Sequence, residues 1–482
     1  MNLPRIALLG SQHRKLMDHF GSDPSGHERA AIVLFRKFSV PETELAGSER
    51  YVAVDVIPFE NNWVTESSAT HVAFRLKPLV DIFRRCEEED LVLGFVHNHP
   101  ASATSFSSVD DVNESVLLNA LKNRNGSKSE LIALLWAGEK WHGRLLGGSR
   151  EDEAPQIQHI AVYGDGITVT GHRGDHSHAD GILDRQAAAF GRPFVDVLQS
   201  LRVAIVGAGG TGSAVATLLA RAGVGELIII DDDHLESSNL NRVRGSTIRD
   251  VGRSKSQVLK EYINGLGLNV SAYSMNSSVD LDPSAIDVLS TCDVVFGCTD
   301  DQIGRELMNL ALYVYGFAYI DLGLGGRVDA DNQGDAILRN HHARISTILP
   351  ESGECLFCQG VLREDWLRRQ QALRDNPDLS EEELDERYLS GGAESAPGVA
   401  PFVGAAADYA VANLFELIRR FRRLPGNVRE DMYSLDFVNM EVSSREKRSD
   451  LSCDFCQRKS FTLMNEHYRL NRPALGKRNE LA

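Results

Sequence analysis

A cluster of glycines directly after a short apolar segment constrains the fold of this chain more than any other feature. Residues 203–206 read Val-Ala-Ile-Val, a helix-like segment spans 213–222, and a second apolar segment ends at Asp231. The glycines between the first two segments are Gly207, Gly209, Gly210 and Gly212. A strand, a glycine-rich turn and a helix in this order are typical of a doubly wound parallel sheet. The glycines let the backbone approach phosphate groups, and the helix N-terminus attracts these anions. Apolar segments at 294–298 and 319–322 predict later strands of the same sheet.

Length and charge limit the class of protein. The 482 residues suffice for two to four domains of ~100–200 residues each. The formal net charge of −17 argues against nucleic acid as a partner, because phosphate backbones bind clustered Lys and Arg. No apolar run approaches the ~20 residues that cross a bilayer, and the N-terminus lacks a signal-peptide pattern. We therefore expect a cytoplasmic protein with no membrane partner.

The pattern of the chain predicts two α/β domains. Residues 1–155 form the first, residues 156–181 combine a hairpin signal with a polar linker, residues 182–470 form the doubly wound domain, and residues 471–482 are a tail. The elements expected in the first domain are strands at 30–35, 51–57, 91–96 and 131–136 and a helix at 109–122.

Two histidines end the predicted strand at 91–96. Because side chains alternate along a strand, His97 and His99 lie on the same side. Imidazoles suit Zn²⁺, and a nearby carboxylate, Asp110, would complete three protein ligands and leave a fourth position for water. Ser107 and Asp110 are also compatible with a helix N-cap box. Both interpretations can hold together, since Asp110 then lies in the first helical turn.

The complete string, His-x-His-Pro followed by Ser-x-x-Asp, resembles the motif of the JAMM (MPN-type) zinc metallo-isopeptidases over about residues 20–145. The resemblance implies a cytidine-deaminase-like α/β fold and cleavage of amide or isopeptide bonds after the C-terminal glycine of ubiquitin-like proteins. It makes His97, His99 and Asp110 the ligands of a catalytic zinc. It makes Ser107 a stabiliser of the tetrahedral oxyanion.

The same resemblance implies a glutamate on an early strand as general base to the zinc-bound water. Glu28, just before the apolar segment at 30–35, is the candidate, and Glu60 and Glu66 are its competitors. A carboxylate in this position accepts a proton from the water and passes it to the leaving amine.

The acid at the end of the second strand, Asp231, first suggests a dinucleotide-binding dehydrogenase. Three later segments favour a different family: Asn-Leu-Asn-Arg at 239–242, Arg-Ser-Lys at 253–255 and Cys-Thr-Asp at 298–300. In this order they resemble the ubiquitin-activating family that includes the bacterial MoeB and ThiF adenylyltransferases. The resemblance runs from about residue 182 to 460. It implies attack of a carboxylate on the α-phosphate of ATP, with Mg²⁺ and cations neutralising the phosphates.

The resemblance assigns roles residue by residue. Asp231 and Asp233 would hold the ribose and the metal region, and Asp300 would position Mg²⁺. Arg185 would reach into the ATP site of a partner subunit, which implies a homodimer. The phosphate ligands would be Asn239, Arg242 and Lys255. One departure is Val243, which stands where family members commonly have Gln.

Two Cys-x-x-Cys pairs resemble the structural zinc site of the same family. They are Cys355 with Cys358 and Cys453 with Cys456. Four thiolates would make a closed tetrahedral site, and a redox pair is the alternative.

Shorter relatives carry a thioester-forming cysteine on a crossover loop, and the matching residues 389–399 contain none. Either the acyl-adenylate is handed on directly, or a hydroxyl, Ser395 or Ser390, takes the acyl group as an oxyester.

These features predict a bacterial-type bifunctional enzyme. Its partner would be a ubiquitin-like or sulfur-carrier protein that ends in glycine, with a conjugating enzyme as a further partner. The zinc domain would trim or deconjugate this carrier, and the second domain would adenylate it. One alternative is sulfur-carrier activation and processing in cofactor or amino-acid biosynthesis. Another is that one domain is an inactive module that binds the carrier.

Overall fold

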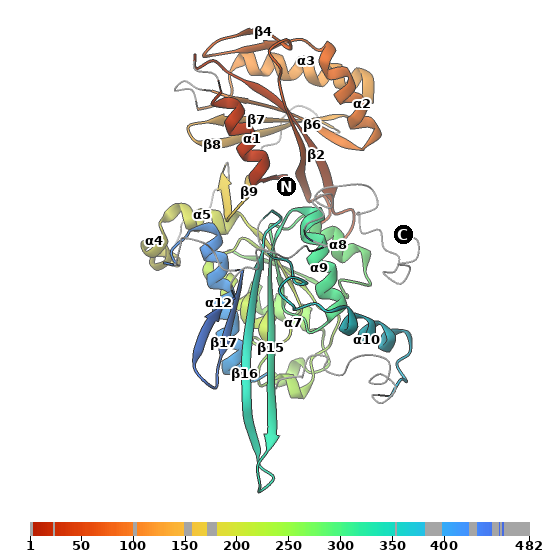
Figure 1. Ribbon diagram of the computed structural model, residues 1–482, viewed down its shortest axis with the longest axis vertical. Coiled ribbons are helices and arrows are strands. Elements are labelled where there is room, and N and C mark those ends of the chain that lie inside the picture. Colours follow the sequence, from red (N-terminus) through yellow and green to blue (C-terminus); the bar gives the residue numbers. More distant parts are fainter. Residues whose placement is uncertain are drawn as a thin grey trace. The chain divides into compact units, whose positions relative to one another are not determined.

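The computed structural model describes residues 3–22, 25–99, 104–148, 157–170, 181–351, 354–380, 398–423, 431–445, 453 and 456. The chain forms two compact units, one within residues 1–177 and the other within 178–461 (Figure 1). Each contains one eight-stranded sheet. Among the described residues, no helix has the length and apolar character needed to span a bilayer.

The sheet of the first unit has the strand order β10-β9-β1-β3-β2-β6-β7-β8. β1 runs parallel to β3 and β9, β6 runs parallel to β7, and the other neighbours are antiparallel. The strands are β1 (Arg5–Leu9), β2 (Ala30–Ser39), β3 (Glu49–Pro58), β6 (Leu91–Asn98), β7 (Glu130–Ala137), β8 (Lys140–Gly147), β9 (His159–Tyr163) and β10 (Ile167–Thr170). The other elements are α1 (Gly10–Phe20), α2 (Val80–Glu88), α3 (Ser108–Asn125), η1 (Lys77–Leu79) and a small hairpin, β4 (Val64–Ser67) with β5 (Val72–Phe74).

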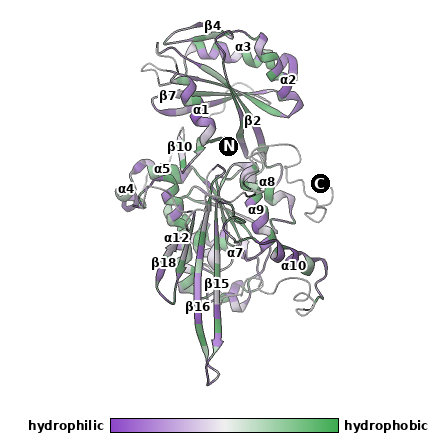
Figure 2. Ribbon diagram, in the orientation of Figure 1, coloured by the Kyte–Doolittle hydropathy of each residue, from purple (hydrophilic) through white to green (hydrophobic). Residues whose placement is uncertain are grey.

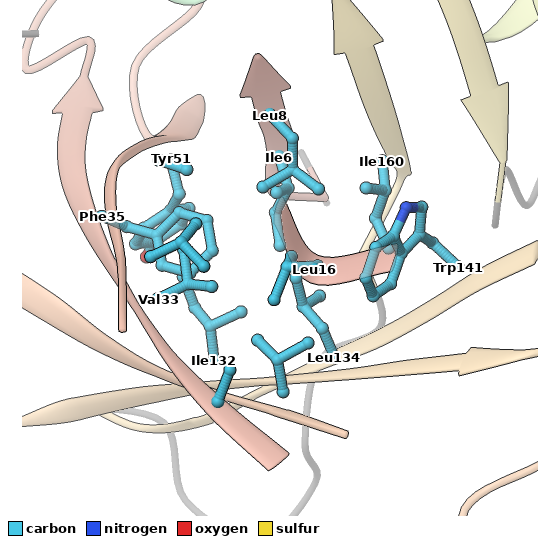
Figure 3. Close-up of a cluster of buried hydrophobic side chains, with 14 of the residues drawn as sticks. Ile6, Leu8, Leu16, Val33, Phe35, Tyr51, Ile132, Leu134, Trp141 and Ile160 are labelled. Carbon is cyan, nitrogen blue, oxygen red and sulfur yellow. The ribbon is translucent and has the colours of Figure 1, made fainter. Parts of the chain in front are cut away.

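In the middle of this sheet, β2 is buried on both faces. Val33 and Phe35 of β2 join the core cluster drawn in Figure 3, in which Leu16 of α1 also packs. Ile32 and Leu34, which alternate with them, join the second cluster. Side chains of a strand alternate between the two faces, so a continuous apolar run here means that neither face meets water.

The sheet of the second unit has the order β13-β12-β11-β14-β15-β16-β17-β18. The first five strands in this order are parallel and the last three run antiparallel to their neighbours. The strands are β11 (Arg202–Val206), β12 (Glu226–Ile230), β13 (Ser271–Met275), β14 (Val294–Gly297), β15 (Ala318–Ala330), β16 (Ala336–Ile348), β17 (Met432–Asp436) and β18 (Glu441–Ser444). The helices are α4 (Asp184–Phe190), α5 (Arg192–Ser200), α6 (Gly210–Ala222), α7 (Lys255–Gly265), α8 (Pro283–Ser290), α9 (Gln302–Tyr315), α10 (Glu364–Asp375) and α12 (Ala400–Ile418), with 3-10 turns η2 (Ser237–Asn239) and η3 (Ile248–Asp250). The predicted mixed α/β, Rossmann-like architecture is confirmed for this unit.

Two features differ from the sequence prediction. The hairpin expected in the linker at 156–181 belongs to the first sheet, because β9 pairs with β1 from Arg5 to Leu9. The strand expected at 319–322 is the start of a much longer one, which continues as a two-stranded ribbon with β16 (Figure 1). The outer part of this ribbon and α10 carry many hydrophilic residues (Figure 2), so neither shows the apolar pattern of a core element.

Candidate active sites

The first candidate site lies where β6 ends and α3 begins. His97 is the seventh residue of β6 and His99 follows the strand, and both side chains are buried. Their Nε2 atoms face each other at 3.3 Å. Asp110, in the first turn of α3, places Oδ1 3.0 Å from Nε2 of His97 and Oδ2 3.5 Å from Nε2 of His99. The three residues predicted as zinc ligands therefore converge on one point.

Ser107 is the N-cap of α3 and fixes the orientation of Asp110. Its backbone N–H and its hydroxyl donate to Oδ2 of Asp110 at 2.6 and 2.7 Å, so the expected capping box is present. Burial raises the pKa of Asp110, but hydrogen bonds from His97 and His99 outweigh it and hold that pKa well below its usual range. Because the Ser107 hydroxyl donates to Asp110, it would have to turn before it could stabilise an oxyanion.

The register of β2 against β6 brings Glu28 to the histidines. Ala30 pairs with His97 in this antiparallel register, so Glu28 falls beside His99. Oε1 of Glu28 lies 3.5 Å from Nε2 of His99, and its side chain is buried. Its competitors form no ion pair with His97 or His99 among the described residues: Glu60 is exposed, and Glu66 pairs with His71 at 3.3 Å.

The donor atoms of this site have the spacing that zinc requires. Imidazole nitrogens bind zinc at about 2.0–2.1 Å, so two of them on a tetrahedral ion lie about 3.3–3.4 Å apart. The 3.3 Å between the Nε2 atoms of His97 and His99 matches this value. Oε2 of Glu28 is buried without a hydrogen-bond partner among the described residues, and burial raises the pKa of Glu28 to about 7. The residues therefore fit a zinc ion with a carboxylate beside it.

The second candidate site lies at the carboxyl ends of β11 and β14, where the strand order reverses direction. Gly207 follows β11 with φ +95°, a conformation that favours glycine. A Cβ atom on Gly212 would stand 1.8 Å from the carbonyl oxygen of Gly207, whereas a Cβ atom on Gly209 would meet nothing within 4 Å. Ligands of doubly wound sheets bind at such a switch point, so this glycine turn is placed where a nucleotide would bind.

Acidic and basic groups border this glycine turn. Asp231 follows β12, is half-buried, and accepts the N–H groups of Ala208 at 2.5 Å and Asp233 at 2.9 Å. Its burial raises the pKa of its carboxyl. Lys255, the first residue of α7, donates to Oδ2 of Asp233 at 2.7 Å. The Asp231 carboxylate thus joins the glycine turn to the end of β12, and Asp233 fixes the ammonium group of Lys255.

Of the remaining predicted nucleotide ligands, Arg242 and the segment that leads to Asp300 approach the same turn, since backbone atoms of Cys298 and Thr299 would lie within 3.0 Å of a Cβ atom on Gly207. The Cδ atom of Arg242 would lie 3.3 Å from a Cβ atom on Gly210, and its guanidinium donates to the carbonyl oxygen of Ser238 at 2.8 Å. Asn239 is buried in η2, and Asp300 is exposed after β14. Arg185 is not brought to the turn: it is exposed on α4, and no ion pair joins it to the turn within the described ranges.

The four predicted cysteine ligands also come together. The Sγ atoms of Cys355 and Cys358 are 3.7 Å apart, those of Cys355 and Cys453 are 3.7 Å apart, and those of Cys358 and Cys456 are 3.6 Å apart. Thiolates at about 2.3 Å from a tetrahedral zinc would be about 3.8 Å apart. All four thiols are free, so their spacing fits a closed metal site better than disulfides.

A buried charge cluster beside the second site was not predicted from the sequence. Asp321, at the end of the parallel part of β15, accepts from Arg305 at 3.1 Å, Arg344 at 2.6 Å and Tyr319 at 3.1 Å. Burial lowers the pKa of Arg305, but nearby negative charges, among them Asp321 and Asp300, outweigh this effect and raise the pKa. An arginine within the apolar pattern of 303–315 is the sequence signal that could have revealed it. Ser390 and Ser395 lie outside the described residues.

Comparisons with known proteins concern the second unit. The model of the ThiF family matches residues 183–455, more than half of the chain. The SAMP-activating enzyme E1 of Haloferax volcanii is 38% identical over 112 residues, 23% of this chain and 41% of that protein. The sulfur carrier protein ThiS adenylyltransferase of Escherichia coli K12 is 33% identical over 130 residues, 26% of this chain and 51% of that protein. The chain therefore spans about half the length of these relatives or less.

A solved structure of E. coli MccB with succinimide aligns with 58% of this chain and 76% of its own, at 19% identity and a TM-score of 0.44. The family match covers the glycine turn, the acids after β12 and β14, and three of the four cysteines, Cys355, Cys358 and Cys453. The chain belongs to the ThiF family.

Proposed function

We propose that the second unit is an adenylyltransferase that activates the C-terminal glycine of a small carrier protein, either ubiquitin-like or sulfur-carrying. The observation that carries this proposal is the ThiF match together with the glycine turn at the switch point between β11 and β14. The carboxylate of the carrier would attack the α-phosphate of ATP, and pyrophosphate would leave. Charge develops on the phosphates during this step, so cations near the turn are the groups that stabilise it.

Each residue of this site would have a separate role in binding ATP and Mg²⁺. The backbone of Gly207–Gly212 and the N-terminus of α6 would hold phosphate oxygens. Arg242 and Lys255 would neutralise phosphate charge, and Asp231 and Asp233 would hold the ribose. Asp300 would position Mg²⁺, which supplies charge neutralisation when bound. Arg185, exposed on α4, would complete the site of a second copy in a homodimer.

For the first unit the proposal is hydrolysis of an amide bond at the C-terminus of the same carrier. His97, His99 and Asp110 would hold Zn²⁺, which when bound supplies a water of lowered pKa. Glu28 would take a proton from that water and deliver it to the leaving nitrogen. Ser107 would keep Asp110 in place. Oε2 of Glu28 is available to accept this proton because it is buried without a hydrogen-bond partner among the described residues.

The relatives support sulfur-carrier activation at least as well as protein conjugation, since one of them is named for the sulfur carrier ThiS. Both interpretations share the adenylation step and differ in the fate of the activated carrier. A thiocarboxylate on the carrier would mark sulfur transfer, and an isopeptide adduct on other proteins would mark conjugation. The four cysteines would hold a structural zinc ion in either case.

The proposal is tested by incubating the full chain with ATP, Mg²⁺ and a panel of small carrier proteins that end in glycine. We expect AMP-linked carrier by intact mass spectrometry with wild type. The same carriers, extended by a few residues, should be shortened only when His97 is present. A carrier panel that yields no AMP adduct would contradict the adenylation, and unchanged extended carriers would contradict the peptidase.

A further inference from the structure

A cavity of about 220 Å³ lies in the first unit beside Glu28. Its wall includes His19 at the end of α1, Glu28 and Arg29 just before β2, Phe59 after β3, and Val64 of β4. The volume is below the ~300–1,000 Å³ of sites for drug-sized ligands. It therefore suits the end of a peptide chain rather than a large ligand.

Glu28 connects this cavity with the histidine site. Oε1 of Glu28 faces Nε2 of His99 at 3.5 Å, while Oε2 is buried without a partner among the described residues. A general acid must come within about 2.6–3.2 Å of the nitrogen that it protonates. The leaving nitrogen therefore lies next to Glu28, and the cavity adjoins that position.

Arg29 supplies the cavity with a positive charge. Its backbone N–H donates to Oδ1 of Asn98 at 2.8 Å, which fixes its place on the chain. Within the described part of the chain, its guanidinium makes no hydrogen bond or ion pair. The pKa of His19 is lowered by burial first and then by the positive charge of Arg29. The second effect requires the guanidinium to lie near the His19 ring.

The other charged groups of the wall are engaged elsewhere. Nε2 of His19 faces the carbonyl oxygen of Ala30 at 3.0 Å, so it donates there. Glu66 pairs with His71, and Glu28 faces His99. Arg29 is thus the cation of the cavity that remains available to a ligand, and a guanidinium pairs best with a carboxylate.

We propose that this cavity binds the residue released by the peptidase, with Arg29 holding its free C-terminal carboxylate. The inference rests on the proposed peptidase function and narrows its substrate to a carrier with a short C-terminal extension. Water oxygen bonds to the glycine carbonyl carbon, the C–N bond breaks, and the proton taken by Glu28 goes to the leaving amine. An isopeptide would place a lysine stem here, with no carboxylate for Arg29.

The test uses two synthetic peptides that end in Gly-Gly-Ala, one with a free carboxylate and one with a carboxamide. Their hydrolysis by the full zinc-loaded chain is followed by mass spectrometry. Because hydrogen bonds to a charged group contribute strongly, we expect kcat/KM to favour the carboxylate about tenfold or more. Arg29→Ala should bring the ratio near one, and Arg29→Lys should retain part of it. The matched control is Arg84→Ala on α2, which should keep the wild-type ratio.

A binding measurement separates this inference from the peptidase proposal. Glu28→Gln chain should bind a fluorescent carboxylate peptide more tightly than the amide, in an Arg29-dependent way. Preferential binding with no hydrolysis by any variant would uphold the cavity and refute the peptidase. Equal hydrolysis and equal binding of both peptides, or faster cleavage of a Gly-Gly isopeptide than of either, would refute the role of Arg29.

Discussion

Glu28 and His99 come from segments 71 positions apart and lie opposite each other because β2 and β6 pair with Ala30 against His97. One register thus brings a buried carboxylate, 3.5 Å from the imidazole, to a site whose other members are local in sequence. A slip of one residue would turn Glu28 to the other face of the sheet. The pairing of these two strands is therefore part of the chemistry that we propose.

The first prediction separates metal binding from catalysis at this site. His97→Ala should lose the zinc ion of this site, but not that of the four cysteines, together with hydrolysis, because it removes a ligand of the first ion. Glu28→Gln should keep zinc and lower hydrolysis of extended carriers by about 10²–10⁴-fold, as expected for loss of a general base. Zinc content is measured by mass spectrometry of the purified chain. Glu60→Gln is the control, and equal effects at Glu60 and Glu28 would contradict the assignment.

The second prediction concerns the four cysteines. Cys355→Ser should release one zinc ion and lower the melting temperature of the second unit, because metal binding contributes folding free energy. Cys86→Ala, in the core of the first unit, should retain that zinc. If alkylation and mass mapping instead find Cys355 disulfide-bonded in the native chain, the metal interpretation is wrong.

The third prediction uses two glycines of one turn. Gly212→Ala should lower the free energy of unfolding by about 1–3 kcal/mol or more, because the new Cβ atom would stand 1.8 Å from the oxygen of Gly207. Gly209→Ala has open space around it, so it should unfold like wild type while binding ATP more weakly. Calorimetry with and without ATP measures both effects. Equal melting temperatures for the two variants would contradict the packing argument.

The fourth prediction concerns Asp321, which lies between the buried Arg305 and the half-buried Arg344. Asp321→Asn would leave Arg305 and Arg344 without a counter-charge, and breaking a buried ion pair costs about 3–5 kcal/mol. Asp329→Asn breaks a surface pairing with Arg327 and Arg339 and should have no measurable effect. The readout is the calorimetric transition that ATP shifts. Similar melting of the two variants would show that the cluster is not a stabilising centre.

The sequence predicted the parts whose patterns are local. The strand at 91–96 and the cap at Ser107 were visible because alternation and capping act over a few residues. The glycine turn was visible for the same reason. The hairpin at 159–170 was recognised, but its parallel pairing with β1 depends on residues far away in the chain.

The sequence does not predict the length of the ribbon of β15 and β16, for a different reason. Beyond Leu322 its residues are mostly half-buried or exposed, so burial imposes no apolar alternation on them. Asp321 and its arginines were missed because only the tertiary fold reveals which charged side chains are buried together. At the first site, the family resemblance points to Glu28, and the register of two strands supplies the physical reason.

The most direct test of the central claim is ATP–pyrophosphate exchange by the full chain with a carrier protein that ends in glycine. We predict exchange that requires the carrier and falls at least about 10²-fold in Asp300→Ala, because a charge-positioning group is lost. Asp335→Ala, on the exposed turn of the ribbon, should exchange like wild type. Exchange in the Asp300→Ala variant at the wild-type rate, or no exchange with any glycine-ending carrier, would contradict the account.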